Sequence, residues 1–460
     1  MIEKNLEYID EVIIEMLNGT LSVFCGAGAD IDATQKRWQD IFTNKTIEFY
    51  NNKYSSDIYF LADLERQYYN SDSFLVDVCK KLNTISNCES QHINNIINLN
   101  INQIWTTNYD LIIEKTIERK FGFAPTIIKE SADLFKENLN SRYVIYKLNG
   151  CVSKPETMVL TKSDFSDYFK KQRLLFEVLK RQLVLDSFLF IGYSFADELV
   201  LNALREIKEV FPNRGKTHYR FMVKNDNDIK AQEYHKFEAS YFYDKYNIKT
   251  IYIDDFKNID NYLKKLYEGF CNHNVFVAGS FRQLRNNQER LYIEKLLNCL
   301  IQKLTENGYN IYSGNGRGLG EIVIAQVNKL KVETHFVNRP LIFTNDTNAE
   351  KDVKNRLIMK DCDTMIIVSG QDDSLTSSKN VISQFRTFLN NAEGKTFPLV
   401  IPIPTTGYAA QDIYNSEEFR NSNVYLTNKE AFEALGSTIE VEDIVTIVIN
   451  LIKSYKFEKM

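Results

Sequence analysis

Short apolar runs that end in glycine or small polar residues recur along the chain, and helical stretches with a 3.6-residue apolar period separate them. Short apolar strands that alternate with helices are typical of a mostly parallel, doubly wound sheet. The pattern restarts near residue 271, and 460 residues exceed one ordinary core. We therefore predict an α/β fold of two Rossmann-like doubly wound units, residues 1–270 and 271–460. The predicted strands are 21–25, 101–105, 143–148, 187–192, 219–223 and 249–253, then 274–280, 310–313, 364–369 and 397–402.

The composition excludes several classes of protein. The formal net charge of −5, with 44% hydrophobic and 25% charged residues, is typical of a globular protein and gives no electrostatic footprint for nucleic acid. No apolar run is long enough to span a membrane, and the N-terminus lacks a signal-peptide pattern. The seven cysteines are scattered, without the close pairs of a zinc site. We expect a cytoplasmic protein that binds no nucleic acid, membrane or metal.

Glycines and polar residues stand where four predicted strands of the first unit end. Any one of them is more often a helix cap or a turn former than a ligand. Because ligands of open α/β sheets bind at the carboxyl ends of the strands, the four groups together indicate one crevice. A glycine turn that opens a helix also favours phosphate there. The residues are Gly26, Ala27 and Gly28, then Asn108 and Asp110, then Asn149, and last Gly192, Ser194 and Asp197.

Four blocks in this order carry a resemblance to a known family. They are Phe-Cys-Gly-Ala-Gly at 24–28, Thr-Thr-Asn-Tyr-Asp at 106–110, Lys-Leu-Asn-Gly at 147–150 and Gly-Tyr-Ser-Phe-Ala-Asp at 192–197. Residues 8–255 thereby resemble the SIR2-like domains of bacterial antiphage proteins. The resemblance implies a domain that binds NAD and hydrolyses its nicotinamide–ribose bond.

The resemblance also implies roles for single residues. It implies that Gly26, Ala27 and Gly28 hold the diphosphate. It implies that Asn108 orients the ribose or the attacking water with support from Asp110, and that Ser194 lines the adenosine side. Since nicotinamide is already a cationic leaving group, such a site mainly has to position ribose and water.

Two residues depart from the family's pattern. Asn149 stands where the family has a His that serves as general base. Asn can hydrogen-bond ribose hydroxyls but accepts no proton, so we expect binding without that base and turnover lowered by about 10²–10⁴. Asp30 stands where the family has a neutral residue, and we expect its carboxylate to turn outward as a helix cap. The zinc-binding cysteine pairs of protein deacylases are absent, which disfavours deacylation.

A second glycine-rich turn, Ser-Gly-Asn-Gly-Arg-Gly-Leu-Gly at 313–320, follows a strand of the second unit. Arg317 lies inside this turn, and the rigid guanidinium fork of arginine suits phosphate. Arg282 and Arg356 are further candidates, although each alone is equally well an ordinary surface or ion-pair residue. The expected ligand contacts of this unit are Gly279, Ser280, Arg282, Gly314, Gly316, Gly318, Arg356 and Lys379.

Residues 273–455 resemble the SLOG family of nucleotide sensors, on the blocks at 277–280, 312–320 and 401–408. The Gly-Gln-Asp-Asp sequence at 370–373 replaces the glycine turn and catalytic Glu of phosphoribohydrolase relatives of this fold. The second unit is therefore expected to be a receptor and not an enzyme.

A SIR2-like domain followed by SLOG resembles the Thoeris antiphage effectors. The resemblance implies that SLOG binds a cyclic ADP-ribose isomer made by a TIR-domain enzyme and thereby turns on NAD hydrolysis. It also implies a homo-oligomer, either a tetramer or a filament. We expect a signal-gated NAD glycohydrolase. The open alternative is a non-catalytic nucleotide-binding switch in which Asn149 marks a dead active site.

Overall fold

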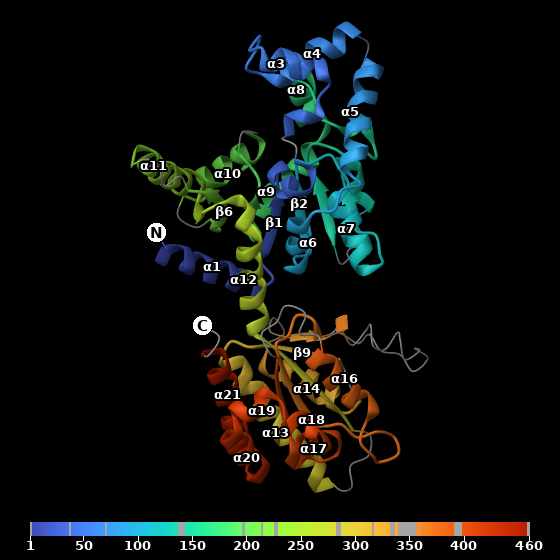
Figure 1. The fold of residues 1–460 in the computed structure, drawn as a ribbon, viewed down its shortest axis with the longest axis vertical. Helices are drawn as coiled ribbons and strands as arrows, with labels where there is room; N and C mark the ends of the chain where they lie inside the picture. Colours follow the sequence, from blue (N-terminus) through green and yellow to red (C-terminus); the bar gives the residue numbers. More distant parts are fainter. Residues whose placement is uncertain are drawn as a thin grey trace. The chain divides into compact units, whose positions relative to one another are not determined.

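The structure is a computed structural model. It describes residues 2–35, 38–69, 71–136, 143–195, 198–212, 215–224, 229–281, 287–314, 317–331, 336–338, 356–357, 359–390 and 398–457. The chain forms two compact units, Met1–Tyr267 and Glu268–Met460, and each is described by itself (Figure 1).

The first unit is built on a seven-stranded sheet with the order β3-β4-β2-β1-β5-β6-β7. Its paired strands all run parallel. Strand β1 lies between β2 and β5, with Phe24 opposite Trp105 on one side and Phe190 on the other. The connections therefore change direction at β1. The strands are β1 (Leu21–Cys25), β2 (Gln103–Thr106), β3 (Thr126–Ile128), β4 (Val144–Lys147), β5 (Ser187–Ile191), β6 (His218–Val223) and β7 (Ile248–Ile253).

Helices surround this sheet and also form an insertion between β1 and β2. Figure 1 shows α3, α4 and α8 together at one end of the unit. The helices are α1 (Ile2–Leu17), α2 (Ile31–Thr34), α3 (Asn44–Asn51), α4 (Ile58–Tyr69), α5 (Ser71–Ile85), α6 (Gln91–Asn98), α7 (Ile112–Phe121), α8 (Lys162–Lys171), α9 (Arg173–Leu185), α10 (Glu198–Val210), α11 (Ile229–Tyr246) and α12 (Ile259–Asn272). Short 3₁₀ segments lie at Ala27–Asp30, Trp38–Ile41, Ser131–Lys136, Pro155–Thr157 and Phe256–Asn258.

The strands of this sheet are buried on both faces, which is why they read as continuous apolar runs. All five residues of β1 and all five of β5 are buried. Phe24, Phe188 and Phe190 pack with residues of α9, α10 and α11 in one apolar cluster. Since successive strand residues point to opposite faces, Val23 and Leu189 face the other side of the sheet. This burial fixes where each strand ends, and so where the polar turns begin.

The second unit has a five-stranded parallel sheet with the order β10-β9-β8-β11-β12. Counted from the first strand of the unit, this is the 3-2-1-4-5 order of a Rossmann-like sheet. The direction of connection changes between β8 and β11. The strands are β8 (Asn274–Ser280), β9 (Asn310–Ser313), β10 (Phe336–Asn338), β11 (Thr364–Ser369) and β12 (Leu399–Ile403). The helices are α13 (Asn287–Glu306), α14 (Leu319–Leu330), α16 (Lys379–Asn390), α17 (Tyr408–Asn415), α18 (Glu417–Arg420), α19 (Asn423–Thr427), α20 (Lys429–Ser437) and α21 (Val441–Phe457), with a 3₁₀ turn at Pro404–Thr406.

The α/β fold with two parallel, doubly wound sheets confirms the sequence prediction, and the predicted strands agree with the observed ones within two residues. The sequence pattern missed the edge strands β3 and β10, which have three residues each. It also missed the helical insertion between β1 and β2. Within the described part of the chain, no helix combines the length and apolarity needed to cross a membrane.

Candidate functional site

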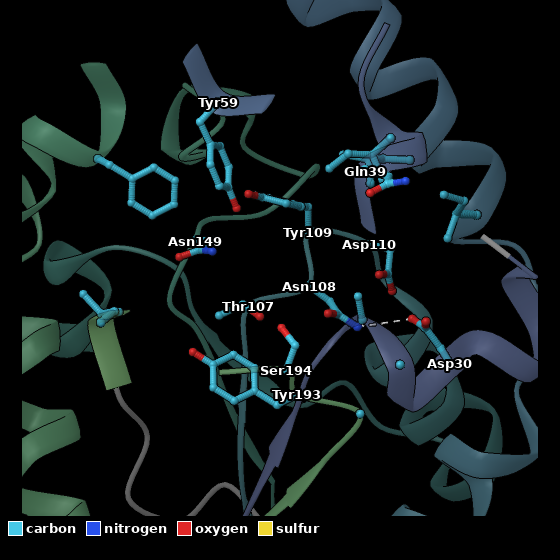
Figure 2. Close-up of a pocket in the computed structure, with 18 of the residues that line it drawn as sticks. Asp30, Gln39, Tyr59, Thr107, Asn108, Tyr109, Asp110, Asn149, Tyr193 and Ser194 are labelled. Carbon is cyan, nitrogen blue, oxygen red and sulfur yellow. Dashed lines mark hydrogen bonds between the residues drawn. The ribbon is translucent and has the colours of Figure 1, made fainter. Parts of the chain in front are cut away.

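A cavity of about 1010 Å³ opens at the carboxyl edge of the first sheet. The turns after β1, β2, β4 and β5 line it, together with helices α4, α5, α8 and α10 (Figure 2). The cavity therefore lies where the strand order changes direction, the place at which open α/β sheets bind ligands. Its volume is at the upper end of the range of about 300–1,000 Å³ that is usual for small-molecule sites.

The glycine turn after β1 has a structural role that the sequence did not predict. The backbone N–H of Gly26 donates to Ile191 O at 2.9 Å, and that of Gly28 donates to Gly192 O at 2.9 Å. A Cβ on Gly26 would lie 2.4 Å from Gly192 O. These glycines let the turns after β1 and β5 touch. Both N–H groups are thus already hydrogen-bonded within the protein, and the role of Gly26, Ala27 and Gly28 as diphosphate contacts stays a prediction.

Asn108 follows β2 and points its side chain into the cavity (Figure 2). Its backbone N–H donates to Thr106 Oγ1 at 2.9 Å. Its side-chain Nδ2 donates both to Gly26 O, at 3.3 Å, and to Asp30 Oδ2, at 3.2 Å. These two bonds use both amide hydrogens and leave Oδ1 as the polar atom that a ligand can approach. The side chain is thus an oriented acceptor at the cavity wall.

Asp30 does not turn outward, so the sequence expectation for this residue is wrong. It is only 4% exposed, it lines the cavity, and its carboxylate makes no helix-capping hydrogen bond. The carboxylate accepts from the Asn108 amide instead. Burial raises the pKa of Asp30 well above its usual range, and the nearby Asp110 and Asp32 carboxylates raise it further. Physically, the contact with Asn108 replaces the helix cap that the sequence suggested.

Asp110 lines the cavity and also holds the turn after β2 in place. Its Oδ1 accepts from the backbone N–H of Ile112 at 2.9 Å, at the start of α7. Its backbone carbonyl accepts from the ammonium of Lys147, which also pairs with Glu114 at 2.8 Å. Lys147 and Glu114 are both almost fully buried, at 1% and 4% side-chain exposure. Burial raises the pKa of Glu114, while the Glu114 carboxylate raises that of Lys147 despite its burial. A buried ion pair thus fixes the floor of the site.

Asn149 follows β4 and also lines the cavity. It is 4% exposed, and its side-chain Oδ1 has no hydrogen-bond partner within the described part of the chain. Its backbone carbonyl accepts from Val159 N at 2.9 Å, which fixes the loop that carries it. Figure 2 shows its side chain across the cavity from Asp30, beside Tyr59 and Tyr109. A buried polar atom with no protein partner is a ready contact for a ligand hydroxyl.

The turn after β5 contributes the remaining predicted residues. Gly192 has φ +63°, and a Cβ there would lie 2.1 Å from Ala29 N, so only glycine fits. Ser194 is exposed at the cavity mouth, next to the half-buried Tyr193 (Figure 2). Asp197 lies outside the described residues. The structure therefore brings Ala27, Gly28, Asn108, Asp110, Asn149, Gly192 and Ser194 to one cavity, with Gly26 directly beneath it.

Several residues that line the cavity were not predicted from the sequence. They come from the insertion between β1 and β2 and from α8, and they include Gln39, Asp57, Tyr59, Lys162 and Phe165. Tyr59 and Phe165 make an edge-to-face contact, with ring centroids 4.7 Å apart, that joins α4 to α8. The sequence indicated these residues only through the long segment between the first two predicted strands, which has more residues than a simple crossover connection needs.

In the second unit Gly279, near the end of β8, is a packing position. Gly279 has φ +151°, and a Cβ there would lie 2.0 Å from Val368 O in β11. Ser280 Oγ donates to Gln371 O at 2.8 Å, and Ser280 O accepts from Gln371 N at 2.7 Å. The turns after β8 and β11 are therefore joined at the point where this sheet changes direction.

The other predicted contacts of this unit divide into three groups. Gly314 lies near the buried Gln384, since a Cβ on Gly314 would be 3.9 Å from Gln384 Nε2. Gly318 begins α14. Arg356 and Lys379 are exposed, and nothing in the described contacts joins them to Gly314. Arg282 and Gly316 lie outside the described residues.

Two family models match the sequence. Residues 102–251 match the SIR2-like domain, and residues 258–455 match the Sir2- and TIR-associating SLOG family. The two matches correspond to the two parallel sheets.

Several curated proteins are similar to this chain. NAD(+) hydrolase ThsA of Enterococcus faecium is 26% identical over 479 residues, which cover 95% of this chain and 96% of that protein. NAD(+) hydrolase ThsA of Bacillus cereus (strain MSX-D12) is 24% identical over 486 residues and 97% of each chain. Defense-associated sirtuin 2 of Bacillus subtilis is 25% identical over 248 residues, 49% of this chain and 23% of that protein. The chain therefore matches a SIR2-like domain and a SLOG domain in one sequence, and it is similar to the ThsA proteins over nearly its whole length.

Proposed function

We propose that this chain is an antiphage effector that hydrolyses NAD to ADP-ribose and nicotinamide in the cavity of its first unit. The observation that carries the proposal is the oriented Asn108 amide in a large cavity at the switch point of the sheet. Similarity over nearly the full length to proteins named NAD(+) hydrolase supports it. NAD is the substrate and not a resident cofactor.

The reaction breaks the bond between the ribose C1′ and the nicotinamide nitrogen. The bonding pair leaves with nicotinamide, which becomes neutral, so the leaving group needs no proton. The site then has to hold the ribose and admit one water. Asn108 Oδ1 accepts a hydrogen bond from the ribose or the water, and the Asn149 amide binds a ribose hydroxyl. Ala27, Gly192 and Ser194 contact the rest of the dinucleotide at the mouth of the cavity.

We further propose that the second unit binds a cyclic ADP-ribose isomer made by a TIR-domain enzyme and thereby activates hydrolysis. The match to the Sir2- and TIR-associating SLOG family supports this role. The Rossmann-like strand order, with a glycine turn after β9, also supports a nucleotide ligand. Gly279, Ser280, Gly314, Gly318, Arg356 and Lys379 are the proposed contacts, with Arg282 and Gly316. The active form is a cytoplasmic homo-oligomer, a tetramer or a filament.

Calorimetry of the purified full-length chain tests both sites. We expect NAD and cyclic ADP-ribose isomers to bind without displacing one another. Failure of either ligand to bind at millimolar concentration would contradict the corresponding part of the proposal.

The alternative is a non-catalytic nucleotide-binding switch, which the presence of Asn149 favours because Asn accepts no proton. Comparison of the chain with its Asn149→His variant separates the two. NAD loss in both, when the cyclic signal is present, supports the enzyme. NAD loss only in the His variant means that the chain with Asn149 is catalytically inactive. Binding of NAD without NAD loss in either chain supports the switch.

A further inference from the structure

We infer that Asp30 is a catalytic residue, the group that accepts the proton of the attacking water. The inference rests on the proposed NAD hydrolysis and deepens it. It assigns to this chain's own carboxylate a step that Asn149 is chemically unable to perform.

The reaction needs a proton acceptor to balance. A bond forms between the water oxygen and the ribose C1′ while the C1′–nitrogen bond breaks and its electron pair leaves with nicotinamide. The protonated oxygen on C1′ then has to lose one proton to give the neutral ribose hydroxyl. The Asp30 carboxylate takes that proton, becomes a carboxylic acid, and returns the proton to solvent after the products leave.

Few of the described cavity residues can accept a proton. Among the described lining residues of the cavity, the carboxyl side chains are those of Asp30, Asp57 and Asp110. Asp57 pairs with Lys162 at 3.1 Å and accepts from Phe60 N at 3.1 Å, and these bonds lower its pKa. A carboxylate stabilised in this way is a poor base.

Asp110 is engaged in holding the backbone. Its Oδ1 accepts from Ile112 N at 2.9 Å, which anchors the first turn of α7. Asp30 differs, because its side-chain partner is the neutral amide of Asn108 at 3.2 Å. That bond occupies one of about four lone-pair positions on the two carboxylate oxygens. Asp110 also has lone pairs left, but Asp30 is the carboxylate that contacts Asn108, the residue that orients the substrate.

The contact with Asn108 also places the acceptor beside the residue that orients the substrate. Asn108 Nδ2 donates to Asp30 and to Gly26 O, so its Oδ1 points away from the carboxylate and toward the cavity (Figure 2). Asp30 lines the same cavity, so its carboxylate is the base in contact with the residue that orients the water. Proton transfer to a positioned carboxylate contributes about 10²–10⁴ in rate.

The surroundings of Asp30 make its carboxylate bind a proton more strongly than an ordinary Asp does. Burial, Asp110 and Asp32 raise the pKa of Asp30, and Lys147 lowers it. Burial raises the pKa of the Cys25 thiol, and Asp30 and Asp110 raise it further, so the thiol stays neutral. A carboxylate whose pKa is raised is a stronger base than one whose pKa is lowered.

Two substitutions separate proton acceptance from positioning. Asp30→Asn retains an oxygen that accepts from the Asn108 amide but takes no proton, whereas Asp30→Ala loses both. The substrate is NAD, the activator is a cyclic ADP-ribose isomer, and the readouts are kcat, KM and the pH profile of kcat/KM. Calorimetric NAD binding of each variant serves as the folding control.

If Asp30 is the base, both variants lose about 10²–10⁴ in kcat while NAD binding stays close to that of the unmodified chain. The acidic limb of the pH profile, where activity rises as Asp30 loses its proton, disappears in both. A normal kcat in Asp30→Asn, with loss only in Asp30→Ala, overturns the inference and leaves Asp30 as a positioning residue. Absence of NAD cleavage by the unmodified, activated chain instead contradicts the proposed function itself.

Discussion

The Asn108 amide nitrogen lies 3.2 Å from Asp30 Oδ2 and 3.3 Å from Gly26 O, so one side chain joins the turns after β1 and β2. Asp30 lies soon after β1 and Asn108 soon after β2, and 78 residues separate the two in the chain. The contact fixes which atom of Asn108 faces the cavity. Each prediction below follows from this arrangement or from the packing that holds it.

Replacement of Asn108 by Ala removes the oriented acceptor and also frees the Asp30 carboxylate. We expect kcat for NAD hydrolysis to fall by about 10² or more, since even small misplacement of reacting groups costs that much. Steady-state kinetics with the cyclic signal present measure it. Asn202→Ala is the matched control, because Asn202 also lines the cavity but comes from α10. Equal losses in both variants would show that Asn108 has no special role.

Asp30→Asn is expected to stabilise the protein at neutral pH while it lowers activity. The pKa of Asp30 is raised in the folded state, so its contribution to stability is fully present below the unfolded pKa, about 3.9 for Asp. That contribution is lost as the pH rises through the folded pKa, because a buried charge then forms. The gain in Tm of the variant over the unmodified chain should therefore grow from pH 4 toward the folded pKa. A gain that shrinks with rising pH would contradict the burial of Asp30.

Lys147→Met tests the buried ion pair under the site. It leaves Glu114 buried without its cation, which is expected to cost about 3–5 kcal/mol. Thermal unfolding followed by circular dichroism measures the loss, and the added change Glu114→Gln should restore part of it. Lys170→Met is the control, since Lys170 pairs with Asp167 at the surface and is 81% exposed. Little change in Tm is expected for the control.

Gly26→Ala tests the close approach of the turns after β1 and β5. Its Cβ would lie 2.4 Å from Gly192 O, a backbone atom that cannot move without shifting β5. We expect a loss of about 1–3 kcal/mol, typical of overpacking, together with weaker NAD binding. Gly215→Ala is the matched control, because nothing lies within 4 Å of its Cβ position. If both variants bind NAD equally well, the contact does not shape the cavity.

The positions of the site residues could be predicted from the sequence because parallel strands bring their carboxyl ends to one edge. Asn108, Asn149 and Ser194 each follow an apolar strand, so the strand pattern alone brought them together. The conformation of each side chain could not be predicted in this way. Asp30 looked like a helix cap, and only the spatial approach of Asn108 shows that it turns inward.

Contacts between distant segments account for most of what the sequence could not reveal. The Gly26 and Gly28 N–H groups bond to the β5 side of the sheet, a pairing set by strand order and not by local sequence. The wall formed by Tyr59 and Phe165 depends on the packing of α4 against α8. In the second unit, the Ser280 bonds to Gln371 follow from the pairing of β8 with β11.

The most direct test of the central claim is NAD consumption by the purified full-length chain, measured with and without a cyclic ADP-ribose isomer. The account predicts release of nicotinamide and ADP-ribose in equal amounts when the isomer is present, and a much lower rate without it. The Asn108→Ala variant should be slower than the unmodified chain by about 10² or more when the isomer is present. An unmodified chain that binds both ligands but leaves NAD intact would contradict the account.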